Sequence, residues 1–267
     1  MKGKVVVITG GSSGIGKALA AEFGAHGSKI MITGRNGFNL EKTVKELEER
    51  GVSISGFRGD VSIEDDNRRM AEEAIERYGS IDILINNAGI SMRALFEEAD
   101  VDVIQRVMNT NFFGTVYATK YCLPEIIRNK GSVIGISSIA GFQGLPGRTG
   151  YSASKFALNG FLEALRLELS PKGTHVLIAC PGFTSTNIRI QALTKNGKVQ
   201  GQSPRDEASM MSPEECARYI YAAAVKRKRT LVLTTQGKLA VLVNKWLPGL
   251  ADRVIFYMMS REPNSPF

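Results

Sequence analysis

Short apolar runs alternate with amphipathic stretches along most of the chain. Seven runs are rich in Val and Ile and almost continuously apolar, which is typical of strands buried on both faces of a sheet. These predicted strands are Lys4–Ile8, Lys29–Thr33, Ser53–Arg58, Ile81–Asn86, Ser132–Ser137, His175–Cys180 and Thr230–Leu233. The stretches between them predict helices over Gly14–Ala25, Leu40–Arg50, Ile63–Tyr78, Val101–Asn129, Tyr151–Ser170 and Pro213–Lys226.

This alternation predicts an α/β fold, in which a seven-stranded parallel sheet of the doubly wound Rossmann type is flanked by helices. No internal repeat or low-complexity linker interrupts the pattern, so residues 1–267 are expected to form a single domain. Residues 184–212 carry Gly197, Gly201 and Pro204 and form a long connection. Long connections of this kind often close over a binding site, so we expect a substrate lid there.

The C-terminal region, residues 237–267, is expected to form a helical extension. Two apolar, amphipathic segments, 239–248 and 249–259, are separated by Pro248-Gly249. Neither reaches the ~20 uninterrupted apolar residues of a membrane-spanning helix. One interpretation is that they close the substrate pocket or a subunit interface. The other is that they lie on a membrane surface, because the basic run 226–229 is close by.

Composition narrows the choice of partners. The 267 residues carry a net charge of +8, which favours an anionic partner. We find no recognition motif for nucleic acid and no basic groove with interleaved aromatic residues, so nucleic acid is not expected. A phosphorylated cofactor or an anionic membrane surface would use the same charge.

Cysteine and histidine usage argues against metal or disulfide chemistry. The three cysteines are scattered and odd in number, which is typical of a reducing compartment. Two histidines are too few for a histidine-based metal site, and no metal is expected. The first apolar run is too short for the core of a secretory signal, so a cytoplasmic location is expected, with contact at a membrane surface as the addition that the C-terminal segments suggest.

A glycine-rich turn follows the first predicted strand and opens the first predicted helix. Glycines at that point allow a tight turn, and the helix N-terminus offers free N–H groups to a pyrophosphate. The residues expected to bind a dinucleotide there are Gly10, Ser12, Ser13, Gly14, Ile15 and Gly16. The alternative is an ordinary Gly-rich turn between a strand and a helix.

The end of the second predicted strand indicates which dinucleotide is bound. An NAD-binding protein places a carboxylate there, on the ribose 2′-hydroxyl. This chain has Arg35 instead, and a guanidinium suits the 2′-phosphate of NADP(H). Ser12 could add a hydroxyl donor. The alternative is that Arg35 is simply solvated at the start of the next helix.

Two further strand ends carry candidate cofactor contacts. Asp60-Val61 follows the third strand, where the carboxylate could accept from an adenine amino group or cap the helix near Ile63. Asn87-Ala88-Gly89 follows the fourth, where small residues let the backbone pass close to a ribose.

The spacing of Tyr151 and Lys155 suggests the chemistry. Four residues apart on a helix, the phenol and the ammonium share one face. A free tyrosine titrates near ~10, and a nearby cation favours the phenolate. We therefore expect Lys155 to lower the pKa of Tyr151 and to make it a proton donor and acceptor for carbonyl–alcohol chemistry. On their own, the two residues could also be a solvated helix face.

Several motifs occur together in a familiar order: Thr9–Gly16, Asn86–Gly89, Asn111, Ser137-Ser138, Tyr151-x-x-x-Lys155 and Pro181-Gly182. In this order and spacing the chain resembles the classical short-chain dehydrogenases/reductases over roughly residues 1–190. It is loosely similar to the branch that includes 11β-hydroxysteroid-dehydrogenase-like and 3-ketosphinganine-reductase-like enzymes. The resemblance also implies a homo-oligomer, a dimer or a tetramer, paired through the long helices.

The resemblance implies a role for each motif. Tyr151 would be the general acid for carbonyl reduction, and Lys155 would lower its pKa and bind the nicotinamide ribose. Ser138 would hold the substrate oxygen, and Asn111 would interrupt its helix and hold a water that relays protons. After the sixth strand, the nicotinamide carboxamide would be held by the run that includes Pro181, Gly182, Thr184 and Thr186.

The expected function is therefore an NADP(H)-dependent oxidoreductase, acting on a hydrophobic ketone or the corresponding secondary alcohol. A lipid-like substrate such as a 3-ketosphingoid base or a steroid is consistent with the apolar C-terminal region. The alternatives are a non-catalytic sensor of NADP(H) and a scaffold at a membrane surface.

Overall fold

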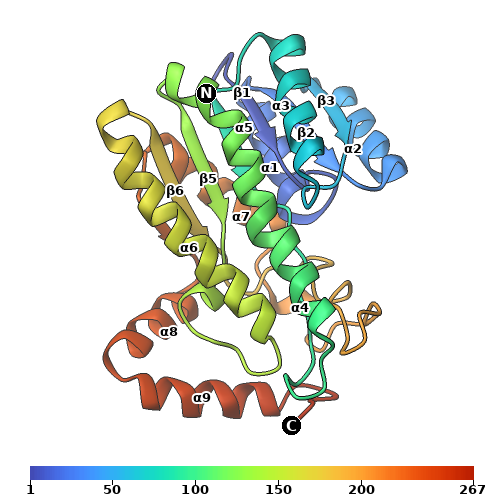
Figure 1. Cartoon of the computed structure of the whole chain (residues 1–267), viewed down its shortest axis with the longest axis vertical. Coiled ribbons are helices and arrows are strands. Elements are labelled where there is room, and N and C mark those ends of the chain that lie inside the picture. Colours follow the sequence, from blue (N-terminus) through green and yellow to red (C-terminus); the bar gives the residue numbers. More distant parts are fainter.

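Seven parallel strands form one sheet at the centre of the computed structural model, which describes residues 1–267 (Figure 1). The strands are β1 (Val5–Ile8), β2 (Lys29–Gly34), β3 (Ile54–Arg58), β4 (Ile83–Asn86), β5 (Ser132–Ile136), β6 (His175–Cys180) and β7 (Thr230–Val232). Their spatial order is β3-β2-β1-β4-β5-β6-β7. The direction of winding reverses between β1 and β4, which opens a crevice at the carboxyl ends of these strands.

Helices cover both faces of the sheet (Figure 1). They are α1 (Gly14–Ala25), α2 (Gly37–Glu49), α3 (Glu64–Tyr78), α4 (Val101–Met108), α5 (Gly114–Arg128), α6 (Thr149–Leu169) and α7 (Pro213–Val225). One core cluster joins the sheet to α1, α2 and α7, and a second joins it to α3, α5 and α6. In β1, Val6 and Ile8 belong to the first cluster and Val7 to the second. The alternation of strand side chains thus explains why the apolar runs are continuous.

The long helix predicted over Val101–Asn129 is divided into three parts. Between α4 and α5, Asn109–Phe113 form a π-helical turn that contains Asn111. Such turns occur mostly as single insertions in α-helices, often at functional sites. The structure therefore places a break in regular helical bonding at the residue for which the resemblance implied one.

The second predicted helix begins earlier than its apolar pattern indicates. Asn36 is its N-cap, and its Oδ1 accepts a hydrogen bond of 3.0 Å from the backbone N–H of Asn39. Asparagine is a favoured N-cap because its side chain satisfies a free N–H of the first turn. The helix therefore starts at Gly37 and not at Leu40.

The segment between β6 and α7, which includes the predicted lid, is mostly irregular and lies beside α4 (Figure 1). Backbone hydrogen bonds attach it to the loop after β4, from Leu193 N to the Ser91 oxygen and from Arg93 N to the Leu193 oxygen. Within it, Arg189 pairs with Glu207. These bonds tie the segment to the loop after β4.

The C-terminal region forms two helices, α8 (Thr235–Trp246) and α9 (Pro248–Ser260), at the end of the molecule opposite the N-terminus (Figure 1). Pro248 occupies the first turn of α9, which a proline tolerates. Ala251 and Met259 are buried, whereas most large apolar side chains of the pair are exposed. No helix in the protein combines the length and apolarity needed to cross a bilayer.

Candidate active site

The glycine-rich turn lies at the carboxyl end of β1, beside the crevice. Gly10 and Gly14 have φ values of +65° and +50°, in the left-handed region that favours glycine. A Cβ on Gly10 would lie 2.9 Å from the Ala88 Cα, so the turn packs closely against the loop after β4. Ser13 is the N-cap of α1, yet its side chain makes no capping bond. Its hydroxyl and the free N–H groups of α1 remain as donors for an anion.

Asn87 ties the loop after β4 to the glycine-rich turn. Its Nδ2 donates to the carbonyl oxygens of Thr9 and Gly10, each at 3.0 Å. The Thr9 hydroxyl accepts from the backbone N–H groups of Asn87 and Ala88 at 3.0 and 3.1 Å. These bonds span neighbouring parallel strands, so Asn87 fixes the shape of the turn. Ala88 and Gly89 keep the adjacent wall free of bulky side chains.

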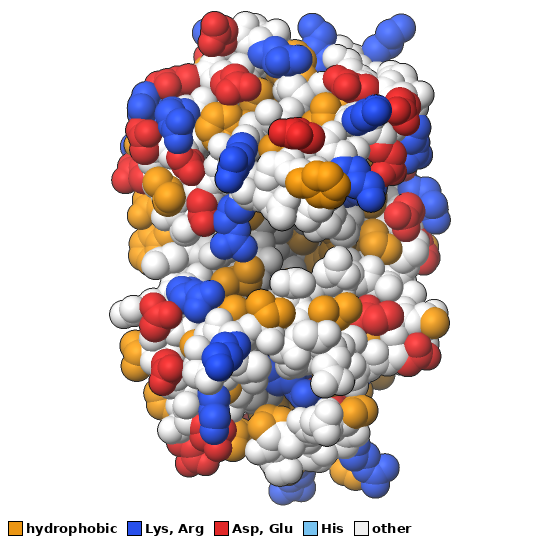
Figure 2. Space-filling model, turned by 90° about the vertical axis from the view of Figure 1, so that its right-hand side faces the viewer, with side chains coloured by type: hydrophobic (Ala, Val, Ile, Leu, Met, Phe, Trp, Pro, Cys, Tyr) orange, Lys and Arg blue, Asp and Glu red, His pale blue; other side chains and the backbone are white.

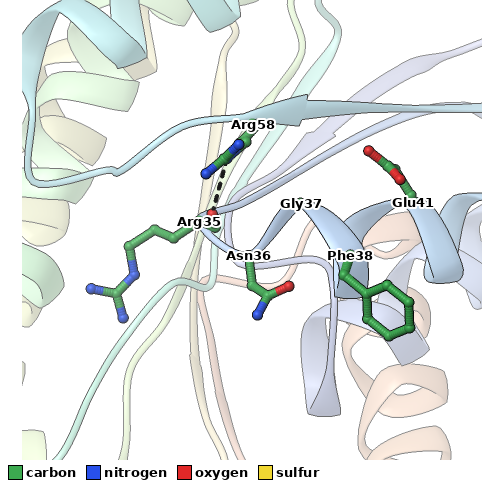
Figure 3. Close-up of a pocket in the computed structure, with 6 residues that line it drawn as sticks. All are labelled: Arg35, Asn36, Gly37, Phe38, Glu41 and Arg58. Carbon is green, nitrogen blue, oxygen red and sulfur yellow. Dashed lines mark hydrogen bonds between the residues drawn. The ribbon is translucent and has the colours of Figure 1, made fainter.

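Arg35 is exposed at the end of β2, and the structure gives it a neighbour that the sequence analysis missed. Arg58, the last residue of β3, donates from Nε to the Arg35 carbonyl oxygen at 3.4 Å. Both arginines line one open depression, together with Asn36, Gly37, Phe38 and Glu41 (Figure 3). Strand pairing aligns Gly34 with Arg58. The parallel register could therefore have revealed the second guanidinium.

Ser12 and Asp60 border the same region. A Cβ on Gly34 would lie 3.0 Å from the Ser12 hydroxyl oxygen, which places that hydroxyl at the end of β2. Asp60 Oδ1 accepts from the backbone N–H and hydroxyl of Ser62, and Oδ2 lies 3.6 Å from an Arg35 nitrogen. The N-cap of α3 is Ile63, so Asp60 does not cap that helix. Asp60 and Val61 instead line a small hollow with Thr33.

Asn111 is buried in the π-helical turn, and its amide is fully engaged. Its Oδ1 accepts from Ile90 N at 2.8 Å, while Nδ2 donates to the Ile90 oxygen and to the Ser154 hydroxyl, each at 2.9 Å. A Cβ on Gly89 would lie 3.2 Å from Asn111 Oδ1 and 3.7 Å from Lys155 Nζ. Asn111 therefore joins the loop after β4 to α6 close to the Lys155 amine.

Tyr151 and Lys155 lie on the first turns of α6, on the side that faces the sheet. The Lys155 Nζ is 5.7 Å from the centre of the Tyr151 ring and donates a hydrogen bond of 2.9 Å to the Ile136 carbonyl oxygen. Lys155 is only 4% exposed, whereas Tyr151 is partly buried. The pair is therefore not a solvated helix face.

The protonation of the pair differs from the sequence-based expectation. Burial lowers the pKa of Lys155 from 10.5 to about 8, because the low-dielectric interior disfavours the ammonium. Burial also raises the pKa of Tyr151, because the apolar surroundings disfavour the phenolate. Side-chain hydrogen bonding with Ser138 and the charge of Arg148 oppose the rise. The net shift is therefore opposite to the lowering expected from the spacing, since desolvation of the phenolate outweighs the influences that lower the pKa of Tyr151.

Ser138 lies between the end of β5 and the crevice. Its hydroxyl oxygen accepts from the Ala140 N–H at 3.2 Å, which fixes the side chain at the start of a short 3₁₀ turn. The hydroxyl keeps its own proton for donation, as holding a substrate oxygen requires. Ser138 and Tyr151 thus bring two O–H groups to one place.

The residues expected to hold the nicotinamide follow β6 and reach the glycine-rich turn. Thr184 is buried and its hydroxyl donates to the Gly182 oxygen at 3.3 Å, after the buried Pro181. A Cβ on Gly14 would lie 3.2 Å from the Thr186 methyl carbon. Thr186 and the glycine-rich turn therefore lie side by side. The face of the molecule that includes α4 is hollowed at mid-height (Figure 2).

The residues present fit a dinucleotide. The close approach of Gly10 to Ala88, the uncapped Ser13 and the two arginines at the end of the sheet provide space, N–H donors and positive charge. The structure brings together no group of three or more His, Cys, Asp or Glu side chains that could hold a metal ion. The donor set therefore suits an anionic organic cofactor.

A family model described as "short chain dehydrogenase" matches residues 4–197. The chain belongs to the short-chain dehydrogenase family. This short-chain dehydrogenase is an oxidoreductase with a Rossmann-type fold. Its seven-stranded parallel sheet is the one predicted from the sequence.

Relatives from animals align along nearly the whole chain. The dehydrogenase/reductase SDR family member 7B of Mus musculus is 35% identical over 271 residues, covering 99% of this chain and 84% of the relative. Its namesake in Xenopus laevis is 37% identical over 268 residues, covering 97% and 82%. Among solved structures, an alcohol dehydrogenase from the archaeon Thermococcus sibiricus, complexed with 5-hydroxy-NADP, has a TM-score of 0.76 and 25% identity. That match covers 86% of this chain and 95% of the other.

Proposed function

We propose that this short-chain dehydrogenase uses NADP(H) to interconvert a hydrophobic ketone and its secondary alcohol. The observation that carries the proposal is the placement of Tyr151, Lys155 and Ser138 together at the carboxyl ends of the central strands. A proton donor, an amine and a hydroxyl that share one crevice with a dinucleotide cradle suit carbonyl reduction.

The choice of NADP(H) over NAD(H) rests on the depression at the end of β2. Arg35 and Arg58 both line it, and its one carboxylate, Glu41, lies apart from the Arg35 guanidinium (Figure 3). Guanidinium groups bind phosphate oxygens through charge-assisted hydrogen bonds. The similar archaeal alcohol dehydrogenase is complexed with an NADP derivative, which agrees with this choice.

In the proposed mechanism, the cofactor supplies the hydride and the protein moves the proton. Tyr151 donates its phenolic proton to the carbonyl oxygen as that oxygen gains negative charge. The Ser138 hydroxyl donates a hydrogen bond to the same oxygen and stabilises the charge. Lys155 would hold the nicotinamide ribose through the N–H groups that do not donate to the Ile136 carbonyl oxygen. In the reverse direction Tyr151 accepts the proton from the alcohol.

Asn111 is proposed to position the proton relay. Its side chain is satisfied by Ile90 and Ser154, which lies one residue before Lys155. The π-helical turn alters backbone bonding at this point, so a water held there could pass protons to the Lys155 amine. Asn111 is thus a positioning residue, while Tyr151 reacts with substrate.

The substrate side of Tyr151 is apolar. Tyr151 packs against a small cluster that includes Met92, Val107 and Leu193. The exposed ring of Phe183 lies just beyond Gly182, which fits the wall of a pocket for a lipid-like ketone. The segment 184–212 is proposed to act as the substrate lid. The C-terminal helices, within 237–267, are proposed to close the other side of the pocket, since Met259 of α9 is buried against the rest of the protein.

Assays with purified protein test the proposal. NADPH is expected to be consumed in the presence of apolar ketones, and NADH to be a poorer donor. The competing hypothesis, a sensor of NADP(H), predicts tight NADPH binding without turnover of any ketone. Failure to bind NADPH at all would contradict both.

A homo-oligomer is also proposed. Phe113 at the start of α5 and Phe156 and Leu167 on α6 are large apolar side chains that are 41%, 47% and 72% exposed. These helices carry the apolar surface that an isologous dimer would bury. Light scattering during size-exclusion chromatography should give at least twice the monomer mass, and Leu167→Asp should reduce it. A monomer at micromolar concentration would contradict the proposal.

A further inference from the structure

A buried cluster of arginines lies beside Tyr151, outside the machinery described above. The Glu262 carboxylate, 4% exposed, accepts from Arg148 Nη2 at 3.0 Å and from Arg205 Nε at 2.7 Å. Arg93 Nη2 lies 3.6 Å from the same carboxylate and donates to the Pro263 oxygen at 2.8 Å. We call these four side chains the arginine cluster.

The cluster holds more positive than negative charge. Three guanidinium groups share one carboxylate, and the Arg93 and Arg148 side chains are each only 10% exposed. Burial and the charges of Arg148 and Arg205 lower the pKa of Arg93. The nearby carboxylate of Glu207 is already paired with Arg189, so it does not neutralise the arginine cluster. Buried charges are costly unless they are paired, so the surplus calls for a further anion.

The helix that begins at this point adds to the positive potential. Arg148 is the N-cap of α6, and the first turn of α6 contains no acidic residue. A helix N-terminus already carries partial positive charge, so a cation there is unfavourable unless an anion is present. The Arg148 guanidinium points toward the C-terminal segment, where it contacts Met259 Sδ at 3.7 Å and Glu262 at 3.0 Å.

The three arginines come from the segments that surround the proposed substrate. Arg93 follows Met92, which packs in the same cluster as Tyr151, and Arg148 precedes Tyr151 by three positions. The Arg205 guanidinium carbon lies 4.0 Å from the centre of the Phe183 ring, next to the nicotinamide side. The charge of Arg148 also acts on the pKa of Tyr151. In the lower half of Figure 2, Lys or Arg atoms are visible inside a recess.

We propose that Arg93, Arg148 and Arg205 bind an anionic group, a phosphate or a carboxylate, on the ketone that Tyr151 reduces. This inference rests on the proposed function and deepens it, because it assigns the substrate an anionic end as well as an apolar chain. Glu262 holds the three arginines in position, and its single negative charge neutralises only part of their positive charge. Arginine suits this task because its planar fork binds the oxygens of phosphate and carboxylate in pairs.

A matched series of ketones tests the inference. Three long-chain ketones with the same carbonyl position would end in a methyl ester, a carboxylate and a phosphate monoester. Wild-type kcat/KM should be at least about tenfold higher for one anion than for the ester, as one charge-assisted hydrogen bond allows. Whichever anion is preferred identifies the group. In Arg93→Gln this preference should fall by about tenfold or more, while the ester reacts within about threefold of wild type.

Control variants separate recognition from folding. Arg261→Gln removes an exposed arginine of the same C-terminal segment, and its preference should equal that of wild type. NADPH affinity should be unchanged in all variants used, and a cooperative unfolding transition establishes that each variant is folded. If Arg93→Gln does not fold, Arg205→Gln replaces it in the assays. Arg205 is the most exposed of the three arginines, at 21%, so its replacement disturbs the interior least. Turnover of the ester with no preference for either anion would overturn the inference and leave the proposed function standing.

Binding provides a readout that does not depend on turnover. A long-chain alkyl phosphate and the matching fatty acid should raise the unfolding temperature of wild type more than the matching alcohol does, and this difference should vanish in Arg93→Gln. If no ketone is reduced, this result would support the anion site while the proposed function fails. Equal shifts with the anions and the alcohol, or an unchanged difference in Arg93→Gln and Arg205→Gln, would overturn the anion site.

Discussion

The Lys155 amine lies 5.7 Å from the centre of the Tyr151 ring and is bonded to the Ile136 carbonyl oxygen, which places a buried amine directly behind the phenol. Burial acts on both groups in the direction that favours their neutral forms. The proton that the reaction needs is therefore held on Tyr151 in the protein without cofactor.

The buried amine should make stability depend on pH. The pKa of Lys155 is about 8 in the folded protein, whereas the ordinary value of 10.5 applies to the unfolded chain. Between these two pH values the unfolded state therefore binds more protons than the folded state. The Lys155 contribution to the free energy of unfolding therefore rises as pH increases from 8 to 10, by up to roughly 3 kcal/mol. The buried thiols act in the opposite direction, since burial raises their pKa to about 12. Only the difference between wild type and a variant isolates the lysine.

Urea unfolding of wild type and Lys155→Met at several pH values measures that difference. The stability advantage of Lys155→Met should be largest below pH 8 and should shrink as pH approaches 10. Lys172→Met, at an exposed position, provides the control and should follow wild type. A constant gap between wild type and Lys155→Met across this range would contradict the burial of a titrating amine.

The two arginines at the end of the sheet should set cofactor choice. Arg35→Asp is expected to shift preference from NADPH toward NADH, because a carboxylate repels the 2′-phosphate and accepts from a 2′-hydroxyl. Arg58→Gln should weaken NADPH binding by roughly tenfold and leave NADH binding within about threefold. Fluorescence titrations with both cofactors measure this. Unchanged selectivity in both variants would mean that neither guanidinium contacts the phosphate.

The exposed face of α8 and α9 should respond to a membrane surface. Trp246 is the only tryptophan and is 71% exposed, with Leu242 and Leu250 also exposed nearby. Lys238, Lys245 and Arg253 lie on the same two helices, and charges of this sign attract anionic lipid. Adding anionic vesicles at low salt should shift the Trp246 emission to shorter wavelength, and neutral vesicles should not. An unshifted spectrum at low salt would exclude this contact and leave pocket closure as the role of the helices.

The sequence patterns predicted the sheet well. The continuous apolar runs locate all seven strands because their side chains are buried on both faces, as Val6 and Val7 show. In a parallel sheet the residues that follow those strands must gather at one edge, so Ser138 and Asn87 could be assigned to the crevice. The cap at Asn36 was missed because it precedes the apolar pattern of its helix.

Other features depend on tertiary structure. The arginine cluster joins four distant parts of the chain, with Arg148 and Glu262 separated by 114 positions, and no local pattern signals that meeting. The rise in the pKa of Tyr151 follows from desolvation of the phenol by its tertiary neighbours, which spacing alone does not give. The spacing of Tyr151 and Lys155 was sufficient to place both groups on one face, but not to decide which electrostatic effect dominates.

The central claim is that Tyr151 donates the proton to the substrate. Single-turnover oxidation of bound NADPH by a long-chain ketone, compared between wild type and Tyr151→Phe, tests it most directly. Replacing the phenol with a phenyl ring removes only the hydroxyl, so NADPH affinity should stay within about threefold of wild type, while the rate falls by roughly 10²- to 10⁴-fold. A Tyr151→Phe protein that oxidises NADPH at the wild-type rate would show that another group supplies the proton.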